Sequence, residues 1–186
     1  MKIYTSTFVA FAILLPFLAS SQEVNQAPKL PMDEKGEKIN YTGVIEVKGT
    51  TPGTLYERAL LWANTFYKNP TDVIREKDST AGKMVCKARF KVMNPADKKG
   101  LATDAGNVMY TLTLQFKEGR YRYELTDFNW KQQSYYACER WMDKTKASYE
   151  PKFDYYLQQM NSTAVEVLKS LEKSISTATS AKTDDW

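Results

Sequence analysis

The sequence contains no histidine, only two cysteines and only eight glycines among its 186 residues. Without histidine the chain cannot form a Ser-His-Asp or Cys-His nucleophilic centre, or an imidazole metal site. Two cysteines cannot complete a zinc site alone, and no glycine-rich phosphate loop is present. Catalysis would have to rely on carboxylates, lysine or tyrosine. These absences predict a chain with no metal and no cofactor, and they favour a protein that is not an enzyme.

Long apolar runs are absent beyond the N-terminus. Residues 8–18 are apolar, Lys2 precedes them, and the small residues 19–21 follow. This arrangement is typical of a secretory signal peptide, whereas a membrane span needs about 18 apolar residues. We therefore expect residues 1–21 to be a signal peptide and the protein to be exported to the periplasm, the cell envelope or the extracellular space. An N-terminal membrane anchor is the alternative, and no other segment is expected to span a membrane.

The rest of the chain divides into one domain with polar ends. Residues 22–38 are polar and contain two prolines and one glycine, which predicts a flexible leader. Residues 177–186 are rich in serine, threonine, alanine and aspartate, which predicts a disordered tail. Residues 39–176 remain as a single domain. The formal net charge of +4 is small for this length and gives no reason to expect a nucleic-acid partner.

The first half of the domain predicts a strand, a helix and a second strand. Apolar and polar residues alternate over 41–47, as in a half-buried strand. Thr54 and Glu57 have the spacing of a capping box, which places the start of a helix at Thr54. Apolar residues then recur at helical spacing until the Asn-Pro pair at 69–70 ends the helix. Residues 72–78 are charged, which is typical of a strand near the edge of a sheet.

Three stronger strands follow. Apolar and polar residues alternate over 84–92 and on both sides of a turn within 108–126. Glu118 and Gly119 have the form of a two-residue hairpin turn. This turn places Phe116 opposite Tyr121, so that the apolar residues of both strands share one face. A slip of one residue would scatter them over both faces, so the turn and the alternation support the same register.

A long helix completes the pattern. Apolar residues recur at helical spacing from about Pro151 to Ile175, which predicts a helix over about 30 Å long. The order is therefore strand, helix, four strands and long helix. The simplest arrangement is an α+β domain with a curved antiparallel sheet of about five strands and both helices on one face, as in helix-grip proteins.

Several segments of the chain resemble a known family. They are residues 39–47 (INYTGVIEV), residues 55–59 (LYERA), Trp62 and residues 119–123 (GRYRY). Together they resemble a secreted family of unknown function, found mainly in Bacteroidota and described as having a TBP-like fold. The resemblance covers about residues 39–128 and implies a TBP-like α+β domain. No activity is established for that family, so it implies no functional residue, and the name of the fold does not imply DNA binding.

Aromatic residues make up 13% of the chain and allow two interpretations. In the first, they line a cavity between the sheet and the long helix that carries an apolar small molecule. The residues expected to line such a cavity are Leu112, Leu114, Tyr121, Tyr123, Tyr156 and Met160. In the second, the aromatic side chains fill the core and its rim, as tyrosine commonly does, and no ligand is involved.

Basic residues are predicted on the opposite face of the sheet. The alternation places Lys87, Arg89, Lys91, Arg120 and Arg122 together there, on strands taken to be adjacent. This surface could bind an anionic glycan, lipid headgroups or a protein. The alternative is an ordinary solvated face.

Two further features have a chemical and a structural interpretation. Cys86 and Cys138 could form a disulfide in an oxidising compartment, or Cys86 could be a small buried side chain and Cys138 incidental. Asp127 is predicted on the inward side of its strand, where an acid could be catalytic or could bond a neighbouring tyrosine. No second acid is placed to form a glycosidase pair with it.

The sequence therefore favours an exported, non-enzymatic binding or interaction module. Its expected partner is an envelope protein, a glycan or an apolar small molecule. The alternative is a carrier that holds an apolar ligand between the sheet and the C-terminal helix. An enzyme that relies on a carboxylate and tyrosine, with Asp127 as its acid, is the third hypothesis.

Overall fold

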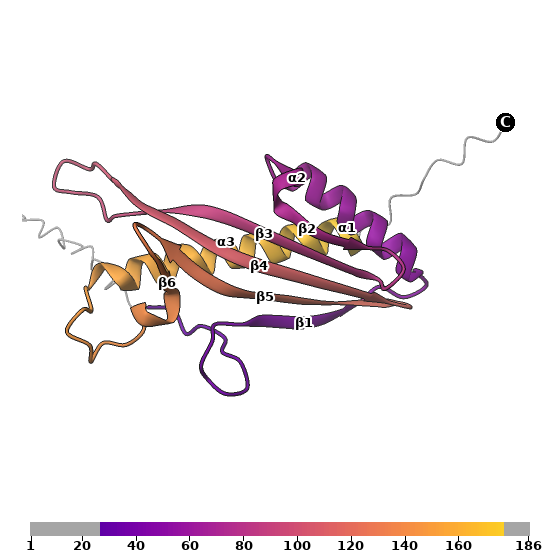
Figure 1. Cartoon of the computed structure of the whole chain (residues 1–186), viewed down its shortest axis with the longest axis horizontal. Coiled ribbons are helices and arrows are strands. Elements are labelled where there is room, and N and C mark those ends of the chain that lie inside the picture. Colours follow the sequence, from indigo (N-terminus) through magenta and orange to yellow (C-terminus); the bar gives the residue numbers. More distant parts are fainter. Residues whose placement is uncertain (1–26, 177–186) are drawn as a thin grey trace, which may run out of the picture.

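The computed structural model describes residues 27–176, which form an unclosed antiparallel sheet with helices on one face (Figure 1). The strands are β1 (Tyr41–Glu46), β2 (Ile74–Asp78), β3 (Lys83–Met93), β4 (Asp104–Lys117), β5 (Arg120–Lys131) and β6 (Tyr135–Ala137). The helices are α1 (Pro52–Phe66), the single turn α2 (Pro70–Val73), a short 3-10 helix (Cys138–Trp141) and α3 (Lys152–Ser176). The strand order is β1-β5-β4-β3-β2, and β6 pairs with the end of β5. The predicted α+β architecture is confirmed, with one short strand more than expected.

The hairpin of β4 and β5 has the register that its turn predicts. Phe116 lies opposite Tyr121, and Leu114 lies opposite Tyr123. Gly119 has a φ of 69°, in the left-handed region that glycine adopts without a steric cost. The turn residue and the alternation therefore determine the same pairing, and this prediction is confirmed.

Helix α1 begins earlier than the capping-box prediction places it. Its N-cap is Thr51, whose Oγ1 accepts a hydrogen bond from the backbone N–H of Thr54 at 3.2 Å. Pro52 occupies the first helical position, where its missing N–H has no partner to lose. Thr54 is therefore inside the first turn, and the prediction that it caps the helix is wrong.

A bulge interrupts the ladder between β4 and β5. Asp127 and Phe128 together oppose Tyr110, and Asp127 has a φ of 55°, a backbone conformation that aspartate adopts more readily than most residues. The extra residue shifts the alternation, so Phe128 is buried on the helical face. The Asp127 side chain is 46% exposed, and its Oδ1 lies 3.3 Å from Lys38 Nζ. The prediction that Asp127 lies inward is wrong, and the hypothesis of a catalytic carboxylate there loses its basis.

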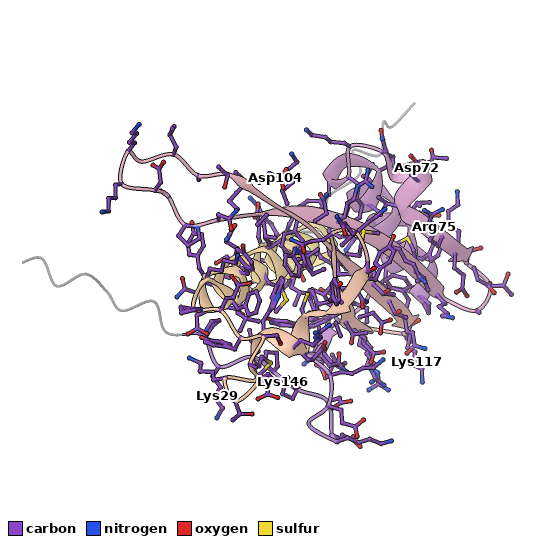
Figure 2. The ribbon with its side chains drawn as sticks, turned by 60° about the vertical axis from the view of Figure 1, so that its left-hand side comes forward. Lys29, Asp72, Arg75, Asp104, Lys117 and Lys146 are labelled. Carbon is purple, nitrogen blue, oxygen red and sulfur yellow. The ribbon has the colours of Figure 1, made fainter. Side chains whose placement is uncertain are left out.

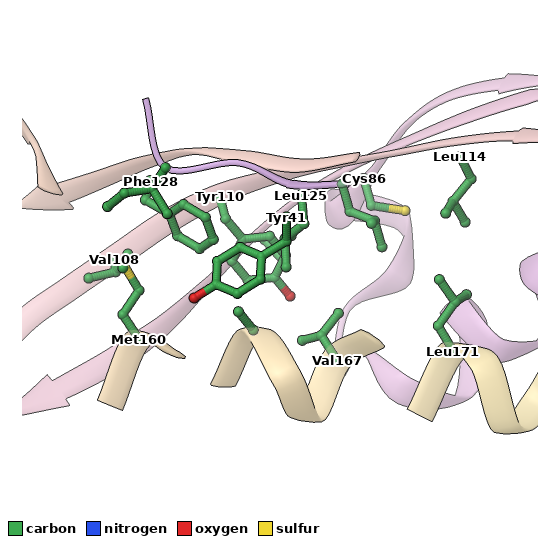
Figure 3. Packing of buried hydrophobic residues seen from close by; sticks show 14 of the residues in the cluster. Tyr41, Cys86, Val108, Tyr110, Leu114, Leu125, Phe128, Met160, Val167 and Leu171 are labelled. Atoms are coloured by element: carbon green, nitrogen blue, oxygen red, sulfur yellow. The ribbon is translucent and has the colours of Figure 1, made fainter. Parts of the chain in front are cut away.

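The core lies between the inner face of the sheet and the helices. Figure 3 shows side chains of α3, among them Met160, Val167 and Leu171, facing Tyr110 and Leu125 of the sheet. The buried side chains form one continuous cluster. Helix α3 reaches across the sheet because it is 25 residues long and its apolar stripe extends from Phe153 to Ile175, as the sequence predicts.

Part of the segment predicted as a flexible leader is packed against the domain. Leu30 is buried in the core cluster, and Met32 forms a bridge with Ile39. The folded unit therefore includes residues before Ile39. The predicted signal peptide (1–21) and tail (177–186) lie outside the described residues. Within the described residues, no helix combines the length and apolarity that crossing a bilayer requires.

The two cysteines are both buried and are not bonded to each other. Cys86 lies on β3, whereas Cys138 directly follows β6, which is three strands away across the sheet. Three strand spacings amount to roughly 14 Å, and a disulfide needs Cα atoms within about 7 Å. The disulfide hypothesis is therefore wrong. Burial raises the pKa of the Cys86 thiol to about 12 and the pKa of Cys138 well above its usual value, so both are unreactive at neutral pH.

Candidate binding cleft at the border of the sheet

The interior between the sheet and α3 is closely packed at the positions where the sequence suggests a carrier cavity. Five of the six side chains are at most 1% exposed, and Tyr123 is partly buried. These side chains also lie towards two ends of the core. Tyr156 packs within an aromatic cluster with Trp130 and Trp141, whereas Tyr121 packs against Phe116. The structure therefore does not bring the six residues together around one space.

A hollow is found instead at the border of the sheet, beside β3. Strand β2 has five residues and pairs with β3 only from Lys83 to Cys86, although β3 continues to Met93. Within the described chain, no strand pairs with β3 beyond Cys86 on this side. In Figure 1 this part of β3 is the outermost strand between β2 and the loop that leads to β4. The short β2 thus leaves more than half of the 11-residue strand β3 without a partner on this side.

An open cleft of about 610 Å³ lies along this uncovered edge. Its walls come from the end of α1, the α2 turn, the beginning of β2, and the middle of α3. Six apolar side chains line it, namely Phe66, Val73, Ala88, Phe90, Met109 and Val167. The volume is within the range of small-molecule sites, which is roughly 300–1,000 Å³.

Two tyrosine hydroxyls lie at the inner end of the cleft. The Tyr110 hydroxyl donates a hydrogen bond to the Tyr67 hydroxyl at 3.3 Å, and both side chains are buried. Burial raises the pKa of Tyr110 to about 12. Burial also raises the pKa of Tyr67, and the neighbouring Tyr110 adds to this effect. Both hydroxyls are therefore neutral at physiological pH and can bond a ligand, but neither is suited to act as a base.

The rim of the cleft has more positive than negative charge. Four basic residues line it, namely Lys68, Arg75, Lys87 and Arg89, together with the acids Asp72 and Glu166. None of the six forms an ion pair with another described residue. Figure 2 shows Asp72 and Arg75 on one border of the molecule, with Lys117 well apart from them. An anionic group that entered the cleft would therefore meet unpaired cations.

The basic residues predicted on the outer face are divided by the structure. Lys87 and Arg89 line the cleft, whereas Lys91 is paired with Asp104 at 2.8 Å. Arg120 and Arg122 lie two strands away on β5, beside a shallow second hollow of about 220 Å³ near the hairpin turn. The five residues share the outer face, but β3 and β5 are not adjacent, and the residues do not form one patch.

The sequence pattern does not single out several residues of the cleft, among them Tyr67, Val73 and Arg75. They come from the end of α1, the α2 turn and the beginning of β2, where the sequence shows only a helix stop and a charged strand. The signal that could have located the cleft is the length difference between residues 72–78 and the next strand. A short edge strand beside a long one leaves backbone groups without a partner.

No group of three or more potential metal ligands occurs among residues 27–176. The polar groups that line the cleft are tyrosine hydroxyls, charged side chains and backbone groups.

The geometry of the sheet and its helices can be compared with known proteins. The sequence model of the family "Domain of unknown function (DUF4468) with TBP-like fold" matches residues 41–131. This region is a DUF4468 domain. The matched region extends from β1 to the end of β5 and so includes the whole uncovered edge of β3.

Solved structures support the same fold over more of the chain. A DUF4468 family protein from Bacteroides ovatus matches with a TM-score of 0.65 and 14% identity, covering 84% of this chain and 96% of that one. A TBP-like protein from Parabacteroides distasonis matches with a TM-score of 0.55 and 14% identity, covering 77% of this chain and 97% of that one. At this identity the likeness shows the fold alone. No curated protein matches the chain.

Proposed function

We propose that this DUF4468 protein is an exported, non-enzymatic binding module whose ligand site is the cleft beside β3. The observation that carries the proposal is the combination of an apolar lining, two neutral tyrosine hydroxyls and four unpaired cations in one hollow of about 610 Å³. Such a site suits a ligand with an apolar part and an anionic group. Sites of this kind typically bind through apolar contact and gain specificity from a few polar groups.

The chemistry of the cleft supports binding better than catalysis. Tyr67 and Tyr110 stay protonated at neutral pH because they are buried. The chain has no histidine to serve as a base, and Asp127 lies at the surface beside Lys38. Asp72 and Glu166 lie at the rim, where they can contact a ligand.

The cleft differs from the internal cavity that the carrier hypothesis expects. The packing of Leu112, Leu114 and Met160 gives no support to an apolar ligand held inside the core. A ligand at the border of the sheet needs no opening of the core, since the cleft already faces solvent.

Binding of the anionic aromatic dye anilinonaphthalene sulfonate tests the site. The purified protein is titrated with the dye, and fluorescence and amide chemical shifts are recorded. The matched variants are Thr163→Trp, which fills the cleft from α3, and Ser162→Trp, which places the same side chain on the exposed neighbouring position. We expect Thr163→Trp to weaken binding about tenfold through loss of apolar contact, and Ser162→Trp to leave it unchanged. Absence of binding, or equal binding by both variants, would contradict the proposal.

Export is tested separately from binding. Expression of the full chain in a diderm bacterium should yield a protein that begins at Gln22 in the periplasm or medium, as measured by intact mass. An uncleaved chain retained in the cytoplasm would contradict export without affecting the binding site.

A further inference from the structure

The uncovered edge of β3 offers backbone groups as well as side chains to a ligand. In an antiparallel ladder, successive residues direct their N–H and C=O groups alternately towards one neighbouring strand and the other. The Gly82 carbonyl, just before β3, accepts a hydrogen bond from the Phe116 N–H of β4 at 2.8 Å. The even-numbered residues of β3 therefore direct their backbone N–H and C=O groups towards β4. The odd-numbered residues Lys87, Arg89 and Lys91 therefore direct both backbone groups away from β4, towards the open side.

Gln159 of α3 shows which chemistry this edge accepts. The Met93 N–H donates to Gln159 Oε1 at 2.9 Å, and Gln159 Nε2 donates to the Met93 carbonyl at 2.9 Å. The side-chain amide thus pairs with Met93 as a peptide group of a neighbouring strand would. Met93 is also odd-numbered, and its backbone groups point away from β4, in agreement with this assignment. Between Cys86 and Met93, the edge has the same outward groups but no strand beside it within the described chain.

We propose that the cleft binds an extended peptide of a partner protein, which continues the sheet antiparallel to β3 along Lys87 to Lys91. This inference rests on the proposed function, because it uses the same cleft, and it names the class of ligand. The span is about 13 Å at 3.3 Å per residue, which is the length of about five peptide residues. Exposed edges of this kind bind peptides by main-chain hydrogen bonds, and side-chain pockets supply the specificity.

The side chains around the edge specify an alternating peptide. Residues directly opposite each other in an antiparallel pair lie on the same face of the sheet. Peptide residues opposite Lys87 and Arg89 would lie beside these two cations and should be acidic. The residues between them would face the cleft, where Phe90, Val73 and Val167 favour apolar side chains. The expected ligand is therefore a strand that alternates acidic and apolar residues.

A blocked seven-residue peptide that alternates glutamate with valine tests the proposal, with a fluorophore at one end and fluorescence anisotropy as the measurement. Two N-methylated versions separate backbone pairing from other contacts. N-methylation at the glutamates removes the N–H groups that would face β3, whereas N-methylation at the valines removes N–H groups that face solvent. Loss of three hydrogen bonds of about 1 kcal/mol each predicts roughly a hundredfold weaker binding for the first. The second should bind within about twofold of the parent peptide.

Protein variants supply the matching control on the other side of the interface. Arg89→Ala should weaken binding about tenfold because a charge-assisted contact is lost. Arg122→Ala removes another exposed cation of the outer face, which does not line the cleft, and should not change binding. A peptide with lysine in place of glutamate should not bind.

Amide hydrogen exchange locates the added strand. In the free protein, the amides of Lys87, Arg89 and Lys91 should exchange quickly, whereas those of Ala88 and Phe90, which bond to β4, should exchange slowly. The peptide should slow the three odd-numbered amides. Binding without this protection, or binding that is weakened equally by both N-methylated peptides, would overturn the proposal.

The outcomes also separate this proposal from the proposed function. If the dye binds the parent protein and Thr163→Trp weakens that binding, but no alternating peptide binds, the cleft is a ligand site and the peptide proposal fails. If neither probe binds at the cleft, both proposals fail. If this protein self-associates through β3 in place of binding the peptide, measured by analytical ultracentrifugation, the partner is a second copy and the peptide proposal fails.

Discussion

Two regions of the molecule contain similar apolar residues but differ in packing. One is the interior between the sheet and α3, and the other is the border of the sheet beside β3. In the interior, Leu112 and Leu114 are fully buried, and the facing helix leaves no shared space among the six residues expected to line a carrier cavity. At the border, Phe90 and Val73 are only partly buried and face an open cleft. Apolar side chains like those that close the core therefore form a candidate binding surface where β2 is too short to cover β3.

This difference shows that the length of β2, and not the composition of the core, creates the candidate site. An antiparallel sheet with one continuous helix across it closes its own interior, because apolar side chains from both layers interdigitate. An edge strand without a full partner has unpaired peptide groups that only another chain, a side chain or water can bond.

Leu112→Ala should have the largest effect on stability, and it tests how closely the interior is packed. A cavity of this kind costs about 2–5 kcal/mol in the free energy of unfolding, because Leu112 is completely buried. The measurement is urea denaturation followed by circular dichroism. The matched control is Thr111→Ala, at the adjacent position on the outer side of β4. A loss below about 1 kcal/mol for Leu112→Ala would show that the interior tolerates a void, as a carrier would require.

Alkaline pH should have the next largest effect, and it acts where the two regions meet. The pKa of Tyr110 is raised to about 12 by burial, above its value of about 10 in the unfolded chain. Folding therefore favours the neutral form of Tyr110. Its contribution to the free energy of unfolding is complete below about pH 10 and is lost as the pH rises towards 12. Two pKa units correspond to about 3 kcal/mol.

The Tyr110→Phe variant distinguishes this effect from general alkaline unfolding. Phenylalanine cannot ionise, so the variant should lose less stability between about pH 10 and 12 than the parent protein. The remaining loss is assigned to other buried tyrosines, including Tyr41, whose pKa burial also raises to about 12. Equal losses in both proteins, measured by urea denaturation at each pH, would show that Tyr110 is solvated through the cleft.

Arg89→Ala should have the smallest effect on stability and tests the border alone. Arg89 is exposed and forms no ion pair with another described residue, so the free energy of unfolding should change by less than about 0.5 kcal/mol. The same variant is expected to weaken the alternating peptide. Thermal denaturation together with the anisotropy titration makes this comparison. A strongly destabilised variant would show that Arg89 supports the fold and not a ligand.

The fold was predictable wherever short-range rules were sufficient. The Glu118-Gly119 turn and the alternation on both sides of it determine the register of β4 and β5, because a shift by one residue would expose a whole apolar face. The stripe of α3 likewise predicts a helix on the sheet. These features depend on residues that are close in sequence or on a period that the sequence itself displays.

The candidate site and the errors depend on longer-range geometry. Asp127 was predicted inward because alternation was continued through a bulge that only the pairing with Tyr110 reveals. The pairing of Cys86 with Cys138 failed because strand order, which the sequence does not display, places them three strands apart. Thr54 was taken as the helix cap because its spacing to Glu57 fits a capping box, although Thr51 and Pro52 form a start that fits equally well.

The sequence by itself determined the five longer strands, the two long helices, most of the faces that they bury and the hairpin register, because hydrophobic periodicity and turn residues act over a few positions. Only the tertiary structure decided which cations are paired, which strand edge is uncovered and where the cleft lies. Those properties depend on strand order and on the relative lengths of neighbouring strands. Both are settled by packing between segments that are far apart in the chain.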